Sequence, residues 1–226
     1  MSSVRIEVAG RSVQVREDLS IDSTGAKVWN TSIVLLRHLE KMRRKLKYDQ
    51  PGRRVLELGA GCGLLGISLA SMGWHVTVTD MAVMLPLLRE NVAQARSSVA
   101  TTDEQDASSN TTRLESGGTL TVRELCWGET DLSEFNGPFD CIVGTDVVFL
   151  ERLVDPLINT LDQLGDTSTN VFICIEPRNA VAYDMFLKRA EQLYDIKQLT
   201  PDAEFRDDFV KLFQLRKRFL ATSSDE

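Results

Sequence analysis

A glycine-rich stretch, Val55–Gly66, holds the most informative residues of the chain. Gly61, Gly63 and Gly66 satisfy the pattern G-x-G-x-x-G directly after a predicted strand and before a predicted helix. Such glycines allow a sharp turn and let a ligand approach the backbone closely. Asp80 ends the next predicted strand, where a carboxylate can accept hydrogen bonds from both hydroxyls of a ribose. The spacing predicts a nucleoside-cofactor site, and the alternative is a tight turn followed by a helix-capping aspartate.

The charge next to this loop distinguishes between cofactors. A dinucleotide places its pyrophosphate at the helix N-terminus, where the helix dipole favours negative charge. Glu57, two positions before Gly59, would repel a pyrophosphate. It suits a cationic cofactor with an amino acid moiety, which favours S-adenosylmethionine because its sulfonium and ammonium are both positive. Glu57 therefore argues against a nicotinamide-dependent oxidoreductase.

The elements that must position these residues alternate between strand and helix. This alternation predicts an α/β fold with a Rossmann-like, seven-stranded, mostly parallel sheet and helices on both faces. An N-terminal β-hairpin and a helix over residues 29–47 are predicted to precede the sheet. The predicted strands are Val55–Leu58, Val76–Thr79, Leu120–Leu125, Cys141–Gly144, Val171–Ile175 and Phe209–Leu215, with Asp195–Leu199 as a weaker candidate that would pair with the last. The predicted helices are Leu64–Met72, Val83–Ala95, Leu150–Leu164 and Ala182–Leu193.

We expect residues 1–226 to form a single domain, of which residues 1–50 make the hairpin and the first helix. Residues 97–118 are polar and nearly free of large apolar side chains, which predicts a flexible surface insertion. Residues 221–226 are expected to be a disordered tail.

Composition narrows the classes of partner. The net charge of −7 disfavours extensive contact with nucleic acid backbone. The four cysteines form no CxxC pair and there are two histidines, so we expect no metal site. We interpret the cysteines as reduced, mostly buried thiols. No apolar run resembles a signal peptide core or a membrane helix, so a cytoplasmic location, also nuclear, is expected, without membrane association.

Further segments carry a family resemblance. The stretch from Val55 to Asp80 resembles the first two motifs of the seven-β-strand methyltransferases. Lys27–Leu36, Leu125–Glu129 and Gly144–Glu151 together resemble the lysine methyltransferases that include the enzyme acting on valosin-containing protein and relatives acting on heat-shock chaperones. Glu176–Arg178 is similar to the valosin-directed member. The resemblance runs from about residue 24 to residue 216, interrupted by the insertion.

The resemblance implies roles for individual residues around the cofactor. Trp127 lies just past the third strand, where its ring could stack on the adenine, and Trp29 could cover the methionine end, because aromatic faces attract cations. For both tryptophans, core packing is the alternative. The implied cofactor-binding residues are Trp29, Glu57, Gly59, Ala60, Gly61, Asp80, Trp127 and Thr145.

Asp146 is the catalytic candidate, because it follows the fourth strand of the glycine-loop sheet at the edge where open α/β sheets bind ligands. Its alternative role is to cap the helix from Leu150. Phe149 stands where the family usually has tyrosine, so the aromatic wall is retained and the hydroxyl is lost. Glu176 and Arg178 are substrate-side candidates, which would orient the substrate or pair with each other.

The chemistry implied is in-line displacement, in which a neutral lysine amine attacks the methyl carbon of the sulfonium. A lysine with a pKa near ~10.4 must first be desolvated and aligned. The expected partner is a protein substrate, with a chaperone or AAA-type ATPase as a candidate, and the expected state is a monomer. The alternatives are a small-molecule methyltransferase, a nucleic acid methyltransferase, and a cofactor-binding interaction protein without catalysis, which the loss of the tyrosine hydroxyl favours.

Overall fold

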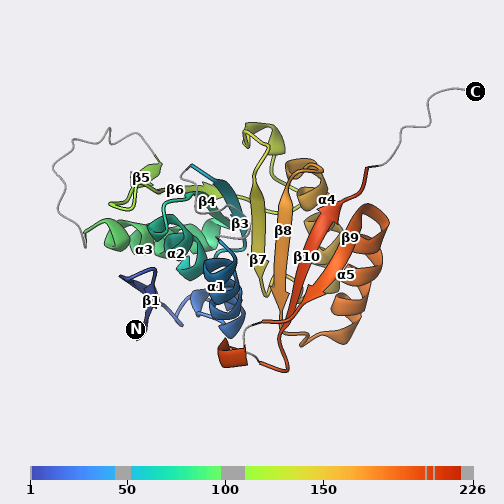
Figure 1. Cartoon of the computed structure of the whole chain (residues 1–226), viewed down its shortest axis with the longest axis horizontal. Helices are drawn as coiled ribbons and strands as arrows, with labels where there is room; N and C mark the ends of the chain where they lie inside the picture. The colour runs from blue at the N-terminus through green and yellow to red at the C-terminus, as the bar shows by residue number, and fades with distance from the viewer. Residues whose placement is uncertain (1, 44–51, 98–109, 202, 206, 220–226) are drawn as a thin grey trace, which may run out of the picture.

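A twisted sheet runs through the molecule, with helices on both of its faces (Figure 1). The computed structural model describes residues 2–43, 52–97, 110–201, 203–205 and 207–219. In these residues, eight strands lie in the order β5-β6-β4-β3-β7-β8-β10-β9. The five strands from β6 to β8 run parallel, while β10 is antiparallel to both of its neighbours and β5 is antiparallel to β6.

The chain enters this sheet through an N-terminal hairpin and a helix. The strands are β1 (Ser2–Val8), β2 (Arg11–Glu17), β3 (Arg54–Leu58), β4 (His75–Asp80), β5 (Thr111–Arg113), β6 (Thr119–Glu124), β7 (Cys141–Thr145), β8 (Asn170–Ile175), β9 (Tyr194–Leu199) and β10 (Lys211–Lys217). The α-helices are α1 (Asn30–Met42), α2 (Leu64–Ser71), α3 (Leu85–Ser97), α4 (Val154–Leu164) and α5 (Ala180–Leu193). Short 3-10 helices are η1 (Thr24–Ala26), η2 (Ala82–Met84), η3 (Leu132–Glu134), η4 (Glu151–Leu153) and η5 (Ala203–Phe205).

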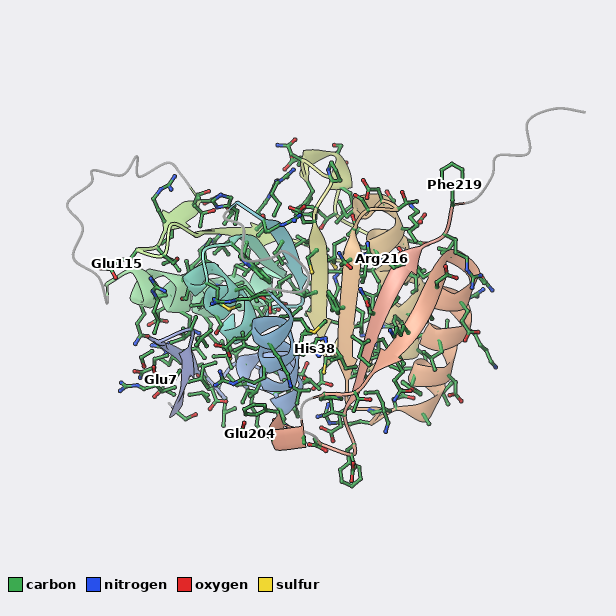
Figure 2. The ribbon with its side chains drawn as sticks, in the orientation of Figure 1. Glu7, His38, Glu115, Glu204, Arg216 and Phe219 are labelled. Atoms are coloured by element: carbon green, nitrogen blue, oxygen red, sulfur yellow. The ribbon has the colours of Figure 1, made fainter. Side chains whose placement is uncertain are left out.

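Successive side chains of each strand point to opposite faces of the sheet, so the apolar side chains form two cores, one on each face. On β3, Val55 packs with α1, α2 and α3 on one face, whereas Leu56 and Leu58 pack with α4 and α5 on the other. Figure 2 shows His38 of α1 facing the sheet, where its ring centroid lies 6.2 Å from that of Phe172 on β8. Because both faces are covered, the central strands are nearly continuous apolar runs.

The N-terminal hairpin packs outside α2 and α3 as a separate two-stranded sheet. The side chain of Asn91 on α3 holds it by accepting from the Arg16 amide (2.8 Å) and donating to the Arg16 carbonyl (2.9 Å). Glu17, the last residue of the hairpin, accepts from the Val28 amide at 2.9 Å. The hairpin thereby fixes the segment that leads into α1.

The predicted α/β class is confirmed, and so is the hairpin of the last two strands, but several details differ. The sheet has β5 as an eighth strand, which uses residues 111–113 of the expected flexible insertion. β10 begins at Lys211 rather than at Phe209, and the helix expected from Leu150 begins as the 3-10 turn η4. The expected end of the first helix at 44–47, most of the insertion (98–109) and the tail lie outside the described residues.

Close packing of α2 on the sheet depends on Gly66. A Cβ atom at this position would lie 2.3 Å from Cγ1 of Val78 and 2.4 Å from Oε2 of Glu57. We expect Gly66→Ala to lower the free energy of unfolding by about 1–3 kcal/mol, because overpacking forces buried groups apart. Denaturant unfolding measures this loss. Gly137→Ala is the control, since its added methyl group would have only the Leu164 carbonyl, at 3.8 Å, nearby; equal losses in both variants would contradict the explanation.

Candidate active site

One pocket of about 210 Å³ lies at the carboxyl ends of β3, β4 and β7. All eight predicted cofactor-binding residues line it, and so do Asp146, Phe149 and Arg178. Glu176 does not belong to the lining. Strands that are distant in sequence end side by side here because they run parallel, which is why a loop after each of them reaches one pocket.

The loop after β3 forms the floor of the pocket. Gly59 (φ +61°) and Gly61 (φ +55°) have left-handed backbone conformations, which glycine adopts without steric cost. A Cβ on Gly61 would lie 2.6 Å from the carbonyl oxygen of Gly25, and one on Gly59 would lie 3.1 Å from Val147. Ala60 joins the loop to the neighbouring strand by donating its amide to the Thr79 carbonyl at 2.9 Å.

Asp80 holds this loop from the end of β4. Its Oδ2 accepts from the Gly61 amide at 2.7 Å and its Oδ1 from the Met81 amide at 2.8 Å. The side chain is buried, and burial raises its pKa, while the two amide donors oppose this rise. The helix-cap alternative is wrong, because the N-cap residue of the following helix η2 is Met81 and no side chain caps that helix. Each carboxylate oxygen keeps a further lone pair, which a ribose hydroxyl can use.

Glu57 is fully buried beneath the same pocket. Its Oε2 has no hydrogen-bond partner within the described part of the chain. The pKa of Glu57 is raised to about 8. Burial is the main cause, the charge of Asp80 adds to the rise, and a hydrogen bond from the Gly66 amide opposes it. A cation in the pocket would favour the ionised carboxylate. A buried carboxylate oxygen without a partner therefore fits a positively charged cofactor, as the sequence predicts.

Glu57 should make stability depend on pH. Folded Glu57 retains its proton up to about pH 8, whereas in the unfolded chain it loses the proton near 4.5. Wild-type stability should therefore fall as pH rises from 4.5 to 8. We expect Glu57→Gln, which stays neutral, to lie within about 1 kcal/mol of wild type at pH 5 and to be more stable by roughly 4 kcal/mol, or ~12 °C in Tm, at pH 8. Melting curves from pH 5 to 9 measure this, and parallel curves for the two proteins would contradict it.

The two pocket tryptophans are half-buried. Trp127 lies beside Gly59, where an added Cβ would be 3.5 Å from its ring. Trp29 donates Nε1–H to the Thr24 carbonyl at 2.9 Å. Its ring is already in contact with two cations, the Arg178 guanidinium at 4.3 Å and the Lys27 ammonium at 5.1 Å from the centroid. Trp74, by contrast, is a fully buried core residue. Trp127 lines the pocket and also packs against the core on the α4 and α5 side of the sheet, so core packing contributes to its position.

Asp146 lies at the end of β7 with a strained backbone. Its φ of +54° is uncommon for a residue other than glycine, and its amide donates to the Cys174 carbonyl at 2.9 Å. Oδ1 accepts from the Glu176 amide at 2.9 Å, and Oδ2 accepts from the Thr31 hydroxyl at 3.0 Å. The helix-capping alternative is wrong, because the η4 N-cap is Leu150 and makes no side-chain bond.

The side chains of Glu176 and Arg178 pair with each other, which is the second of the two roles considered for them from the sequence. Arg178 also forms an ion pair with Asp146, with 3.2 Å between Nη1 and Oδ2. Phe149 is half-buried in the pocket wall. Each of these residues follows β7 or β8, so the two adjacent parallel strands bring them together.

Sequence reasoning assigned no individual role to two further residues, Thr31 behind the pocket wall and Gly25 in the pocket lining. Thr31 is fully buried on α1 and bonds to Asp146, 115 positions away. Gly25 approaches the glycine loop, and its carbonyl accepts from Sγ of Cys62 at 3.3 Å. The described cysteines form no disulfide, and burial raises the pKa of the Cys62 thiol to about 12. In the described chain, no group of three or more His, Cys, Asp or Glu side chains could hold a metal ion.

The sheet order, the glycine loop and the acid that ends β4 define the class of S-adenosylmethionine-dependent methyltransferases with a Rossmann-like fold. Solved structures show the same fold: the T. thermophilus 16S rRNA methyltransferase RsmC, in complex with AdoMet and guanosine, has a TM-score of 0.60 at 19% identity over 96% of this chain and 50% of that one. A TehB-like SAM-dependent methyltransferase from Corynebacterium glutamicum has a TM-score of 0.56 at 14% identity over 85% and 89%.

Within this class, the chain belongs to the lysine methyltransferase family, whose model matches residues 8–193. It is 30% identical to protein N-lysine methyltransferase METTL21A of Danio rerio (90% of this chain, 84% of the relative) and 32% identical to the Mus musculus protein of that name (93% and 85%). The mouse EEF1A lysine methyltransferase 3 is 29% identical over 73% of this chain and 61% of its own length. Family membership confirms the predicted enzyme class and cofactor, and it decides against the oxidoreductase, nucleic acid and small-molecule interpretations.

Proposed function

We propose that the chain methylates a lysine side chain of one particular protein and that Asp146 positions the acceptor amine. The carboxylate of Asp146 is the observation that carries this assignment. It lines the pocket together with the cofactor-binding loop and is fixed by Thr31 and the Glu176 amide. A fixed carboxylate beside the methyl donor can accept a hydrogen bond from an amine and orient its lone pair.

The residues around Asp146 supply the other requirements of the reaction. S-adenosylmethionine provides an electrophilic methyl carbon on a positively charged sulfur. A lysine ammonium must lose its proton before it can attack, and its pKa falls when the group leaves water. Phe149, Leu153 and Trp29 line this part of the pocket with apolar surface. Insertion between these side chains removes water from the amine. On the cofactor side, Asp80 supplies a carboxylate, and a bound cation would favour the ionised form of Glu57.

The identity of the protein substrate is a finer proposal. The resemblance favours a heat-shock chaperone or an AAA-type ATPase, and the name of the mouse relative adds EEF1A as a third candidate. We further propose that the enzyme acts as a monomer in the cytoplasm, and also in the nucleus. Unpaired cysteines suit a reducing compartment. In the described residues, no helix is long and apolar enough to cross a membrane.

Transfer of labelled methyl from S-adenosylmethionine into a cell extract tests the proposal. Samples are treated with protease, nuclease or a size filter before counting. Label that is lost only to protease, and that acid hydrolysis recovers as methyl-lysine, is the expected result. Label that passes the filter, or that nuclease removes, would contradict a protein substrate. A stable protein that binds the cofactor but labels no extract and none of the three purified candidates would support a binding protein without catalysis.

A matched pair of variants links the label to the pocket. Asp146→Asn changes the carboxylate in the pocket, whereas Asp184→Asn makes the same change at an exposed position of α5 outside it. Labelling should fail in the first variant and persist in the second. Equal labelling by both would remove Asp146 from the proposed acceptor site.

A further inference from the structure

The guanidinium of Arg178 lies inside a cage of groups that bind cations. Its Nη1 is 3.2 Å from Oδ2 of Asp146, and its Nη2 donates to Oε2 of Glu176. The face of the Trp29 ring lies 4.3 Å away, measured from the centroid to the guanidinium carbon. Two carboxylates and one aromatic face are also the groups that proteins use to hold ammonium ions. The cage would therefore suit a lysine ammonium as well as a guanidinium.

Two of the three walls of this cage, Asp146 and Trp29, are held in place independently of Arg178, whereas the Glu176 carboxylate is bonded to Arg178 itself. Asp146 is fixed by the Thr31 hydroxyl and the Glu176 amide, and Trp29 by its bond to the Thr24 carbonyl. Arg178 itself is attached by a long side chain that is 40% exposed. It can leave towards solvent through side-chain rotation while Asp146 and Trp29 stay where they are.

We infer that Arg178 occupies the acceptor's cation subsite in the free enzyme and that the incoming lysine must displace it. The inference rests on the proposed function, because Asp146 is the carboxylate assigned to the acceptor. Arg178 lines the same pocket as Phe149 and Leu153, so both cations would use one space. Two positive charges cannot share the Asp146 carboxylate without repulsion, and Lys27, 5.1 Å from the Trp29 centroid, adds a third.

This arrangement makes Arg178 an internal competitor. A cation that enters the cage must displace the Arg178 guanidinium, which the chain itself holds there. This competition lowers the apparent affinity of the cage for the entering cation. An acceptor protein overcomes this competition through contacts outside the pocket, whereas a free amine lacks such contacts. Arg178 would thereby select lysines of a docked protein over free amines in the cell.

The experiment uses butylammonium as a probe that carries only the lysine ammonium and its alkyl stem. Calorimetry at constant ionic strength measures its binding to the full chain loaded with S-adenosylhomocysteine. We expect Arg178→Gln and Arg178→Met to bind butylammonium at least ~10-fold more tightly than wild type. Arg178→Lys keeps a cation and should bind as weakly as wild type, and Arg178→Gln with Asp146→Asn should lose the gain.

Equal affinities in wild type, Arg178→Gln and Arg178→Met would overturn the inference. So would a gain that persists in the double variant, because the cation would then bind elsewhere. The affinity for S-adenosylhomocysteine verifies that each variant is folded, and Arg178→Met preserves the apolar stem over Trp29 if Arg178→Gln is unstable. The readout does not require methyl transfer. Tight binding by Arg178→Gln without protein labelling would reject the proposed function alone, and labelling without the gain would reject the inference alone.

Discussion

Asp146→Asn is expected to lower the rate of lysine methylation by about 100- to 1000-fold, the loss typical of removing one preorganised electrostatic group from an active site. Asparagine has nearly the shape of aspartate, and its carbonyl oxygen can still accept from the Glu176 amide. The Thr31 hydroxyl can reverse its role and accept from the new NH₂ group. The variant therefore loses the negative charge that attracts and orients the amine, together with the ion pair to Arg178, while the hydrogen bonds to Thr31 and Glu176 can be kept.

The rate is measured as kcat/KM on the extract protein that wild type labels. Binding of S-adenosylmethionine, measured by calorimetry, should stay within about twofold of wild type because Asp80 and Glu57, the residues predicted to contact the cofactor, are unchanged. A variant that binds the cofactor normally and keeps more than a tenth of the wild-type rate would contradict a role for the Asp146 charge. A parallel loss of cofactor affinity would assign Asp146 to the cofactor side instead.

Asp80→Ala is expected to weaken S-adenosylmethionine binding by about 10- to 100-fold. Hydrogen bonds to charged groups contribute roughly 1.5–3 kcal/mol each, and the variant removes the carboxylate proposed to accept from the ribose. It also leaves the amides of Gly61 and Met81 without their acceptor, so the glycine loop loses its anchor. Both effects reduce affinity.

Calorimetric titration with S-adenosylhomocysteine measures the loss without turnover. Asp80→Asn separates the two effects, because its carbonyl oxygen can anchor one amide while the charge is gone. We expect it to bind with an affinity between those of wild type and Asp80→Ala. If Asp80→Ala bound the cofactor analogue within threefold of wild type, the end of β4 would not supply the ribose acceptor. The cofactor's position in the pocket would then have to be revised.

Most of the sheet could be predicted because its strands are buried on both faces. Runs such as Val55–Leu58 and Val171–Ile175 are recognisable at the sequence level, and the structure extends them by one residue at the start. β5 was not predictable in this way. Thr111–Arg113 is short and polar, and it is a strand because it pairs with β6, where the hydroxyls of Thr111 and Thr121 lie 2.9 Å apart. Such tertiary pairing leaves no apolar pattern in the sequence.

The residues of the candidate site also differ in whether they could be predicted from the sequence. The glycine loop and Asp80 were predictable because local spacing fixes their geometry. The surroundings of Asp146 were not, since they join α1 to the ends of β7 and β8 across 115 positions of the chain. The sequence also predicted Trp29 as a face for the cofactor's sulfonium. The structure places the Arg178 guanidinium over that ring, a contact that depends on where β8 ends.

The left-handed backbone at Asp146 has a consequence for how this chain could change under selection. Glycine adopts such a conformation most readily, and asparagine and aspartate both adopt it more readily than most other residues do. Asparagine would also keep most of the hydrogen bonds there. A library of Asp146 variants sorted for folding alone should therefore retain asparagine alongside aspartate, while sorting for methylation should return aspartate alone. At this one position, folding tolerates more amino acids than catalysis does.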